Sequence, residues 1–245
     1  MTGDLLLGRA RELWTELAVT PVEFPSNGAN VVVSPGSWLC PPLWTGVVIL
    51  GGAGIVTAPS VHAAQLMADA SRRLSPEKLV DDDRLREVLP VLDVLGPASL
   101  FYLDRADFLP AHEGAAVEEV MYDDELVSLL ARAGEEDADE SGLDTITSPA
   151  FVLREGEDVV AAAGYRTWPQ SVAHLSVLVA PDCRGRGLAR VVASAAVTHA
   201  LDAGQLPQWR ARPHPSKRVA HALGFQELGS QLSVRLGDGA DSARR

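Results

Sequence analysis

Short runs of apolar residues, broken by turns, alternate with segments of helical periodicity through the first third of the chain. The apolar spacing from Ser60 to Leu74 predicts a helix, and the charged segment from Ser75 to Val94 predicts one or two more. The remaining runs predict strands at Asn30–Ser34, Thr45–Leu50, Gly54–Ala58 and Ala98–Leu103. This mixture predicts an α/β fold for the region.

The second half of the chain repeats the mixture after a break at Arg105–Gly114, which we interpret as a linker. A helix is predicted at Tyr122–Ala133, followed by an acidic loop at Gly134–Ser148. Strands are predicted at Phe151–Glu155, Val159–Arg166 and Val172–Ala180, and a G-E-D turn joins the first two as a hairpin. The expected division is an α/β accessory domain over residues 1–115, a second domain over 116–236 and a disordered tail over 237–245.

The segment V-L-V-A-P-D-C-R-G-R-G-L-A, residues 177–189, joins an apolar strand to a helix through a glycine-spaced arginine loop. Gly185 and Gly187 lack the side chains that would hold a ligand away from the backbone. The amides from Arg184 to Ala189 can therefore converge on one anion at the positive end of the helix dipole, with Arg184 and Arg186 as charged donors. The apolar face of the helix is expected at Leu188, Val191, Val192, Ala195, Ala196 and His199.

At these residues the chain resembles the GNAT superfamily of N-acyltransferases, whose pyrophosphate motif is Q/R-x-x-G-x-G/A and reads Arg184 to Ala189 here. The tripeptide W-R-A at 209–211, followed by a helix that ends in L-G-F at 223–225, resembles the end of a GNAT domain. The resemblance covers roughly residues 116–236. It implies a GNAT-type mixed central sheet flanked by helices, preceded by a smaller α/β domain. Whether residues 1–110 are a degenerate first copy of the same fold stays open.

The resemblance also implies that acetyl-CoA is the acyl donor and that no metal is needed. The backbone of the strand before the loop would hold the pantetheine arm. Ser216 keeps a serine of the family pattern, and it is expected either to contact the donor or to cap a helix over Lys217–Leu223. The expected donor-binding residues are Val177, Leu178, Val179, Arg184, Gly185, Arg186, Gly187, Leu188, Ala189 and Ser216.

Three residues are candidates for the base that removes a proton from the attacking amine. His174 lies on the predicted strand before the loop, where alternation places it on one face with Ser176 and Leu178. Its neutral imidazole can accept a proton near pH 7, and the alternative role is packing. Glu140 and Asp144 lie in the segment that is expected to line the acceptor site. A carboxylate there could bind or deprotonate the amine, and the alternative is that it is only solvated.

The chain departs from the family at the position where a tyrosine often protonates the departing thiolate. That position is Ala220, and Pro213 replaces an asparagine that often stands seven residues earlier. Water can serve as the acid instead, because a thiol pKa of about 8.5 lies not far above neutral pH. Tyr165 is an alternative acid or a packing residue at the end of its strand.

The composition excludes several classes of partner. The 245 residues include 21 Lys and Arg against 33 Asp and Glu, a formal net charge of −12, which is unlike the basic surface that nucleic acid or an anionic membrane requires. The sequence shows neither a membrane-spanning apolar run nor the pattern of a signal peptide, so a cytoplasmic location is expected. Cys40 and Cys183 lie far apart, form no metal motif and fit reduced thiols.

These observations predict an acyl-CoA-dependent N-acetyltransferase that acts on the amine of a small molecule. The stretches Gly187–Ser194 and Pro207–Ser216 are similar to the zwittermicin A resistance type of GNAT protein. A non-catalytic acyl-CoA-binding sensor is the alternative that the missing tyrosine and asparagine leave open. A P-loop or dinucleotide-binding protein is excluded because neither glycine motif is complete.

Overall fold

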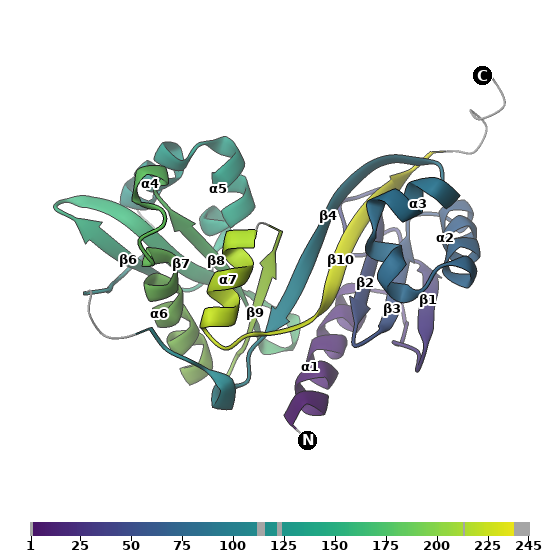
Figure 1. Ribbon diagram of the computed structural model, residues 1–245, viewed down its shortest axis with the longest axis horizontal. Coiled ribbons are helices and arrows are strands. Elements are labelled where there is room, and N and C mark those ends of the chain that lie inside the picture. The colour runs from purple at the N-terminus through teal and green to yellow at the C-terminus, as the bar shows by residue number, and fades with distance from the viewer. Residues whose placement is uncertain (1, 112–115, 122–123, 213, 238–245) are drawn as a thin grey trace. The chain divides into compact units, whose positions relative to one another are not determined.

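A computed structural model describes residues 2–111, 116–121, 124–212 and 214–237 (Figure 1). The chain forms two compact units, one of residues 1–100 with 227–245 and one of residues 101–226. The last strand thus belongs with the N-terminal elements, and the units divide the chain at points other than residues 115 and 236. Of the predicted tail, residue 237 is described, and residues 238–245 lie outside the described residues.

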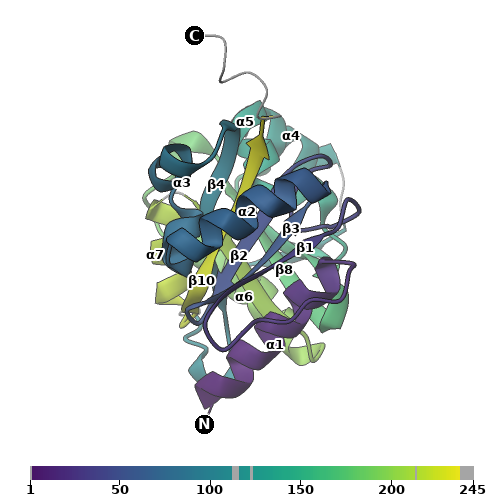
Figure 2. The same ribbon diagram turned by 90° about the vertical axis from the view of Figure 1, so that its right-hand side faces the viewer.

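The first unit is a mixed sheet with helices packed against it. Its strands follow the order β1-β3-β2-β10-β4, in which β1 is parallel to β3 while β2 is antiparallel to both β3 and β10. Helix α2 lies across these strands (Figure 2). The elements are α1 (Thr2–Leu17), β1 (Gly28–Val33), β2 (Thr45–Leu50), β3 (Ala53–Ala58), α2 (Val61–Arg73), α3 (Asp82–Val88), β4 (Val91–Tyr102) and β10 (Gln226–Leu236).

Local sequence explains where the helices of this unit begin and end. The predicted helix from Ser60 is confirmed, and the Ser60 hydroxyl caps it by accepting a hydrogen bond from the Ala63 amide at 3.2 Å. The prediction of helix up to Val94 is wrong in its last part, because Val91 already begins β4. Pro90 disfavours helical backbone at the residue before it, which accounts for the break. Helix α1 was not among the predicted elements, although its buried residues Leu6, Ala10, Leu13, Trp14 and Leu17 have helical spacing.

The second unit is the expected mixed sheet flanked by helices. Strands β5 to β8 pair as successive antiparallel neighbours, and β9 joins β8 in parallel, which gives the order β9-β8-β7-β6-β5. Helices α5 and α6 lie on opposite sides of these strands (Figure 1). The elements are β5 (Glu118–Val120), α4 (Asp124–Ala133), α5 (Glu135–Ser141), β6 (Ala150–Glu155), β7 (Asp158–Trp168), β8 (Val172–Val179), α6 (Leu188–Asp202), β9 (Leu206–Ala211) and α7 (His214–Ala222).

Helix α5 corrects the predicted acidic loop over Gly134–Ser148. Its sequence E-E-D-A-D-E-S has no continuous apolar face, so periodicity gave no helical signal. Three acidic residues in its first turn nevertheless favour the positive end of the helix dipole. The helix ends at Gly142, which adopts a left-handed conformation with φ of 61° and donates its N–H to the Ala138 carbonyl at 3.3 Å. The predicted helix over Tyr122–Ala133 is confirmed from Asp124, and its first two residues lie outside the described residues.

A close backbone approach after α7 fixes the end of the second unit. Gly224 has a φ of +90°, and a Cβ atom there would lie 1.9 Å from the Asp107 carbonyl oxygen. The Leu109 amide donates to the Leu223 carbonyl at 3.0 Å beside this contact. The glycine of the L-G-F sequence therefore serves both a left-handed turn and a close contact between two chain segments.

Replacing Gly224 by alanine tests this constraint. Gly224→Ala should destabilise the protein by about 1 to 3 kcal/mol more than Gly156→Ala, because both add strain at positive φ but only Gly224→Ala also adds a clash. Gly156 is a matched control, since it has a φ of +67° and its added Cβ would meet nothing within 4 Å. The measurement is the free energy of urea unfolding, and equal losses for the two variants would contradict the close approach.

Candidate active site

The parallel pairing between β8 and β9 stops after three residues. Val172, Ala173 and His174 pair with Leu206, Pro207 and Gln208, while β8 itself continues to Val179 with β7 as its partner. We call the point beyond His174 and Gln208 the fork. Past the fork, the side of β8 that faces away from β7 has no partner strand among the described residues. The backbone groups on this side of Val177, Leu178 and Val179 can therefore bind an extended ligand.

The glycine loop after β8 has an open backbone. Gly185 and Gly187 have φ values of +78° and +82°, and an added Cβ atom would meet nothing within 4 Å at either position. Helix α6 begins at Leu188 directly after Gly187. The predicted order of strand, loop and helix is confirmed, and both glycines are exposed.

The amides of this loop are available for an anion. Backbone N–H groups at the start of a helix have no partner within the helix, so a ligand or a side chain must satisfy them. In the described part of the chain, no hydrogen-bond acceptor is recorded for the N–H groups of Gly185, Arg186, Gly187, Leu188 and Ala189. These groups lie at the start of α6, where the helix dipole is positive, and helix starts of this kind bind phosphate groups in proteins.

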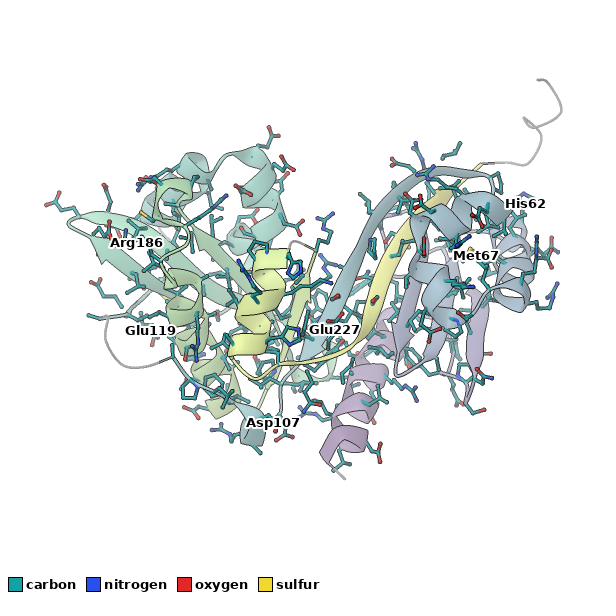
Figure 3. The ribbon with its side chains drawn as sticks, in the orientation of Figure 1. His62, Met67, Asp107, Glu119, Arg186 and Glu227 are labelled. Atoms are coloured by element: carbon teal, nitrogen blue, oxygen red, sulfur yellow. The ribbon has the colours of Figure 1, made fainter. Side chains whose placement is uncertain are left out.

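The two loop arginines are held by carboxylates of neighbouring elements. Arg184 pairs with Asp137 of α5 at 2.6 Å, and its Nε donates to the Val179 carbonyl at 3.3 Å. Arg186 lies beside β6 (Figure 3), where it pairs with Glu155. The hydrogen bond from Arg186 lowers the pKa of the Glu155 carboxyl below its ordinary value. Both pairs are about half exposed, so each contributes little to stability and can exchange for a ligand phosphate.

Helix α6 buries a face that is rotated from the predicted one. Val192, Ala193, Ala196, Val197 and Ala200 are fully buried. The predicted core positions Leu188, Val191, Ala195 and His199 are only partly buried, although the three apolar ones still pack against the core. Val192 and Ala196 belong to the predicted face and are confirmed as core, whereas Ala193, Val197 and Ala200 extend the core on one side of it, where their burial turns the other side of the predicted face partly outward.

His174 lies at the fork in a crowded polar environment. Its imidazole stacks on Trp168 of β7, with ring centroids 4.2 Å apart and an interplanar angle of 13°, and its Nδ1 shares a hydrogen bond with Oε1 of Gln208. Because an amide oxygen only accepts, the proton lies on Nδ1 and leaves Nε2 as an acceptor. Burial and the positive charges of Arg210 and Arg166 lower the pKa of His174 to about 3, although the Gln208 bond opposes the shift. His174 is therefore neutral near pH 7.

The carboxylates proposed as alternative bases lie on the same side of the sheet as His174. Ser176, two residues along β8 from His174, donates its hydroxyl to the Gly142 carbonyl at 3.1 Å. Glu140 and Asp144 stand on either side of Gly142 in the sequence. Glu140 pairs with Arg212, and the Nε of Arg212 donates to Oε1 of Glu140 at 3.0 Å. Asp144 is exposed in a short turn. The fold therefore brings all three candidate bases to one region.

The remaining sequence candidates have other environments. Ser216 accepts a hydrogen bond from the Trp209 indole at 2.9 Å, and it lies inside α7, so the alternative that it caps a helix from Lys217 is wrong. Ala220 is fully buried in the core. The Tyr165 hydroxyl shares a hydrogen bond of 2.9 Å with His199 of α6, which supports its packing role.

Three further features bear on chemistry. Burial raises the pKa of the partly buried Cys40 thiol to about 11, so Cys40 is not an activated nucleophile, and Cys183 is buried. Among the residues that the structure covers, no group of three His, Cys, Asp or Glu side chains could hold a metal ion. Within the same residues, no helix has the length and apolar character needed to cross a membrane.

Comparison with known families bears on the second unit. Residues 149–230 match the family model described as GNAT acetyltransferase. The matched region runs from β6 to the start of β10, and it contains the fork, the glycine loop and α6. The resemblance seen in the loop sequence is therefore confirmed at the level of the acetyltransferase family model.

Several solved structures are similar to this chain, and one reaches a TM-score of 0.50. A GNAT-family acetyltransferase from Colwellia psychrerythraea is 11% identical with a TM-score of 0.50, over 94% of this chain and 96% of that chain. A GCN5-related N-acetyltransferase from Kribbella flavida is 19% identical with a TM-score of 0.49, over 67% of this chain and 66% of that chain. A GCN5-related N-acetyltransferase-like protein from Streptococcus suis is 16% identical with a TM-score of 0.48, over 79% of this chain and 84% of that chain.

The chain thus spans slightly less than two thirds of the Kribbella protein. No curated protein matches the sequence. The comparisons support a GNAT acetyltransferase fold and leave the acceptor to be inferred from the chemistry of the site.

The environment of His174 predicts a pH effect on stability. The unfolded chain binds a proton at His174 near the ordinary pKa of 6.5, whereas the folded chain binds one only near pH 3. Between these values the unfolded state holds more protons, so His174 should make the protein lose stability as the pH falls from about 6.5 toward 3. His174→Gln should therefore lose less stability than wild type when urea unfolding is compared at pH 7 and pH 4. The variant His62→Gln, at an exposed helix position, is the control, and an equal loss in His174→Gln would contradict the prediction.

Proposed function

We propose that this protein is an N-acetyltransferase that moves the acetyl group of acetyl-CoA to the amine of a small molecule. The observation that carries the proposal is the set of unpartnered amides at Gly185–Ala189, next to a strand whose edge is open beyond the fork. The match of residues 149–230 to the GNAT acetyltransferase model supports it.

The donor would bind along two connected surfaces. The pyrophosphate of CoA would accept hydrogen bonds from the loop amides, with Arg184 and Arg186 released from Asp137 and Glu155 to the phosphates. The pantetheine arm would pair with the open edge of β8 at Val177, Leu178 and Val179. Ser216, whose oxygen already accepts from Trp209, retains a hydroxyl proton to donate.

The reaction needs a free amine and a stabilised oxyanion. An ammonium first loses a proton, and the amine lone pair then attacks the thioester carbonyl carbon. The nitrogen of the tetrahedral intermediate then loses its extra proton to water, the carbon–sulfur bond breaks as the intermediate collapses, and the departing thiolate takes up a proton from water, which gives the amide and free thiol with no net change in protons at this step. A backbone N–H on the open edge of β8 would stabilise the oxyanion.

His174 is proposed as the group that meets the amine, through the free acceptor Nε2. Gln208 fixes its tautomer and Trp168 fixes its plane, so the ring is preorganised. Its low pKa gives a weak driving force for proton removal in the free protein. Glu140 and Asp144 are the alternative bases. Glu140 would first have to leave its ion pair with Arg212, and either carboxylate could also take the proton through a water molecule.

The acceptor class suggested by the similarity to the zwittermicin A resistance type is a small amine. Ala220 is buried, so it leaves no room for an acid at the position of the family's tyrosine, and water completes the reaction. A sensor that binds acyl-CoA without transfer is not favoured, because the open strand edge and a preorganised imidazole lie together.

Donor binding gives the first test of function. Acetyl-CoA at about a hundred times its dissociation constant should add roughly 2.7 kcal/mol of stability, and Arg184→Glu or Gly187→Asp should abolish the gain by placing negative charge against the pyrophosphate. Thermal unfolding with and without acetyl-CoA measures this. Arg105→Glu and Gly156→Asp are matched controls, because Arg105 pairs with Asp202 at the far end of α6 and Gly156 has a similar positive φ. Absence of any stabilisation of the wild type would overturn the donor site.

The role of His174 gives the second test. His174→Ala should lower turnover by about a hundredfold with little change in acetyl-CoA affinity, because general-base catalysis typically contributes that much. Turnover is measured as free thiol release with a panel of amines, and affinity by calorimetry. An unchanged rate would move the role to Glu140, Asp144 or solvent. Acetyl-CoA binding without thiol release from any amine would instead favour the sensor.

A further inference from the structure

The side chain of Gln208 uses one of its two polar groups and leaves the other without a partner. Its Oε1 accepts the hydrogen bond from Nδ1 of His174. Its Nε2 has no hydrogen-bond partner among the described residues, and the residue is 0% exposed, so bulk water does not reach this N–H group. A buried donor without an acceptor is destabilising and is uncommon in folded proteins. The Nε2 group is therefore a candidate for a bond that a ligand completes.

The position of Gln208 in the sheet indicates which ligand would supply the acceptor. Gln208 is the last residue of β9 that pairs with β8, so it stands where the two strands part. The glycine loop lies at one end of the open edge of β8, and the fork lies at the other end. At about 3.3 Å per strand residue, the edge from Val177 back to His174 spans roughly 10 Å. A ligand that follows this edge from the loop therefore ends at Gln208.

A donor bound as proposed would reach Gln208 with its acyl end. Its pyrophosphate would lie at the glycine loop, and its pantetheine arm would run along the edge from Val179 to Val177 toward the fork. The thioester follows the pantetheine arm, so its carbonyl oxygen would arrive beside His174 and Gln208. This oxygen is a hydrogen-bond acceptor, and the buried Nε2 has a donor to offer.

We propose that Gln208 is a catalytic residue whose Nε2 donates a hydrogen bond to the thioester carbonyl oxygen of the acyl donor. This inference rests on the proposed acetyl transfer and assigns a further residue to it. The Nε2 group would join the backbone N–H of β8 at the oxygen where negative charge develops. Because Nε2 is covered, the entering acyl group must part the side chains around it. The hydrogen bond moves no atom, so the proton balance of the reaction is unchanged.

The same amide would couple the oxyanion to the base. Resonance joins the oxygen and nitrogen of a carboxamide, as it does in a peptide bond. When His174 takes the proton of the substrate ammonium, its Nδ1–H becomes a charged donor and its bond to Oε1 strengthens. This polarises the amide, so Nε2 becomes a better donor as the oxyanion forms. Gln208 would thus link the positive ring to the negative oxygen.

Donor analogues test this contact without transfer. S-ethyl-CoA is a thioether that has the same acyl-sized chain as acetyl-CoA but no carbonyl oxygen. Calorimetry should show that wild type binds acetyl-CoA more tightly than S-ethyl-CoA, and Gln208→Met should reduce this ratio by about fivefold, the worth of one hydrogen bond. Gln205→Met is the matched control and should keep the ratio, because Gln205 bonds to Thr167 at 3.1 Å before β9 begins. An unchanged ratio in Gln208→Met would overturn the inference and leave the transferase function standing.

Turnover separates the proposed contact from a role that only orients His174. Gln208→Met should lower kcat by about a hundredfold or more and change the KM for acetyl-CoA much less, because a donor to the oxyanion acts mainly in the transition state. Thiol release measures both constants. A residue that only orients His174 would also lower kcat, but it would leave the binding ratio of the two donors unchanged. That combination would overturn the inference.

A measurement on the wild type needs no variant. The side-chain amide protons of Gln208 are identified in NMR spectra by their proximity to the His174 ring. They should move downfield when acetyl-CoA is added and stay in place when S-ethyl-CoA is added, because only acetyl-CoA offers the oxygen. Equal responses to the two compounds, in a protein that acetyl-CoA stabilises, would overturn the inference alone. Failure of both compounds to stabilise the protein would overturn the proposed function, and the inference with it.

Discussion

The end of the β8–β9 pairing is the constraint on which the rest of the second unit depends. Had the two strands stayed paired to Val179, the edge of β8 would be satisfied by β9 and closed to any ligand. Because pairing stops at His174 and Gln208, β8 has an unpaired backbone edge beyond these residues, and the same strand leads directly into the glycine loop. The same point gathers side chains from β7, β8 and β9 on one face. The proposed donor binding and the proposed acceptor chemistry therefore depend on the same feature of the sheet.

The site combines rigid and exchangeable parts. The His174 ring is fixed by stacking on Trp168 and by its bond to Gln208, and both partners come from strands that belong to the sheet. The loop arginines, by contrast, are half exposed and paired with carboxylates that they can leave. Rigid groups suit the orientation of a reacting atom, and exchangeable groups suit the arrival of a charged ligand.

Local patterns predicted those parts of the site that are continuous in sequence. The strand, the glycine loop and the start of α6 follow directly from residues 177–189, and Ser60 identified a helix start in the first unit. Helix α5 was missed because its acidic sequence has no apolar stripe, and it is positioned partly by contacts such as Ser176 with Gly142. Gln208 lies 34 residues from His174, so no local pattern joins them. Arg166 and His174 lie on predicted strands that follow each other in the sequence, but no pairing of these strands was predicted.

The carboxylates that hold Arg184 and Arg186 have a consequence for ionic strength. If the loop arginines had no carboxylate partners, each one that bound a phosphate would add a new ion pair. Added salt screens such ion pairs, so it would weaken phosphate binding steeply. Here each arginine breaks a pair with Asp137 or Glu155 when it takes up a phosphate, so contacts are exchanged and not added. The freed carboxylates also remain near the anion. Under the proposed function, affinity for the donor would thus be carried mainly by the uncharged loop amides, and it would vary less with salt than the two arginines alone would suggest.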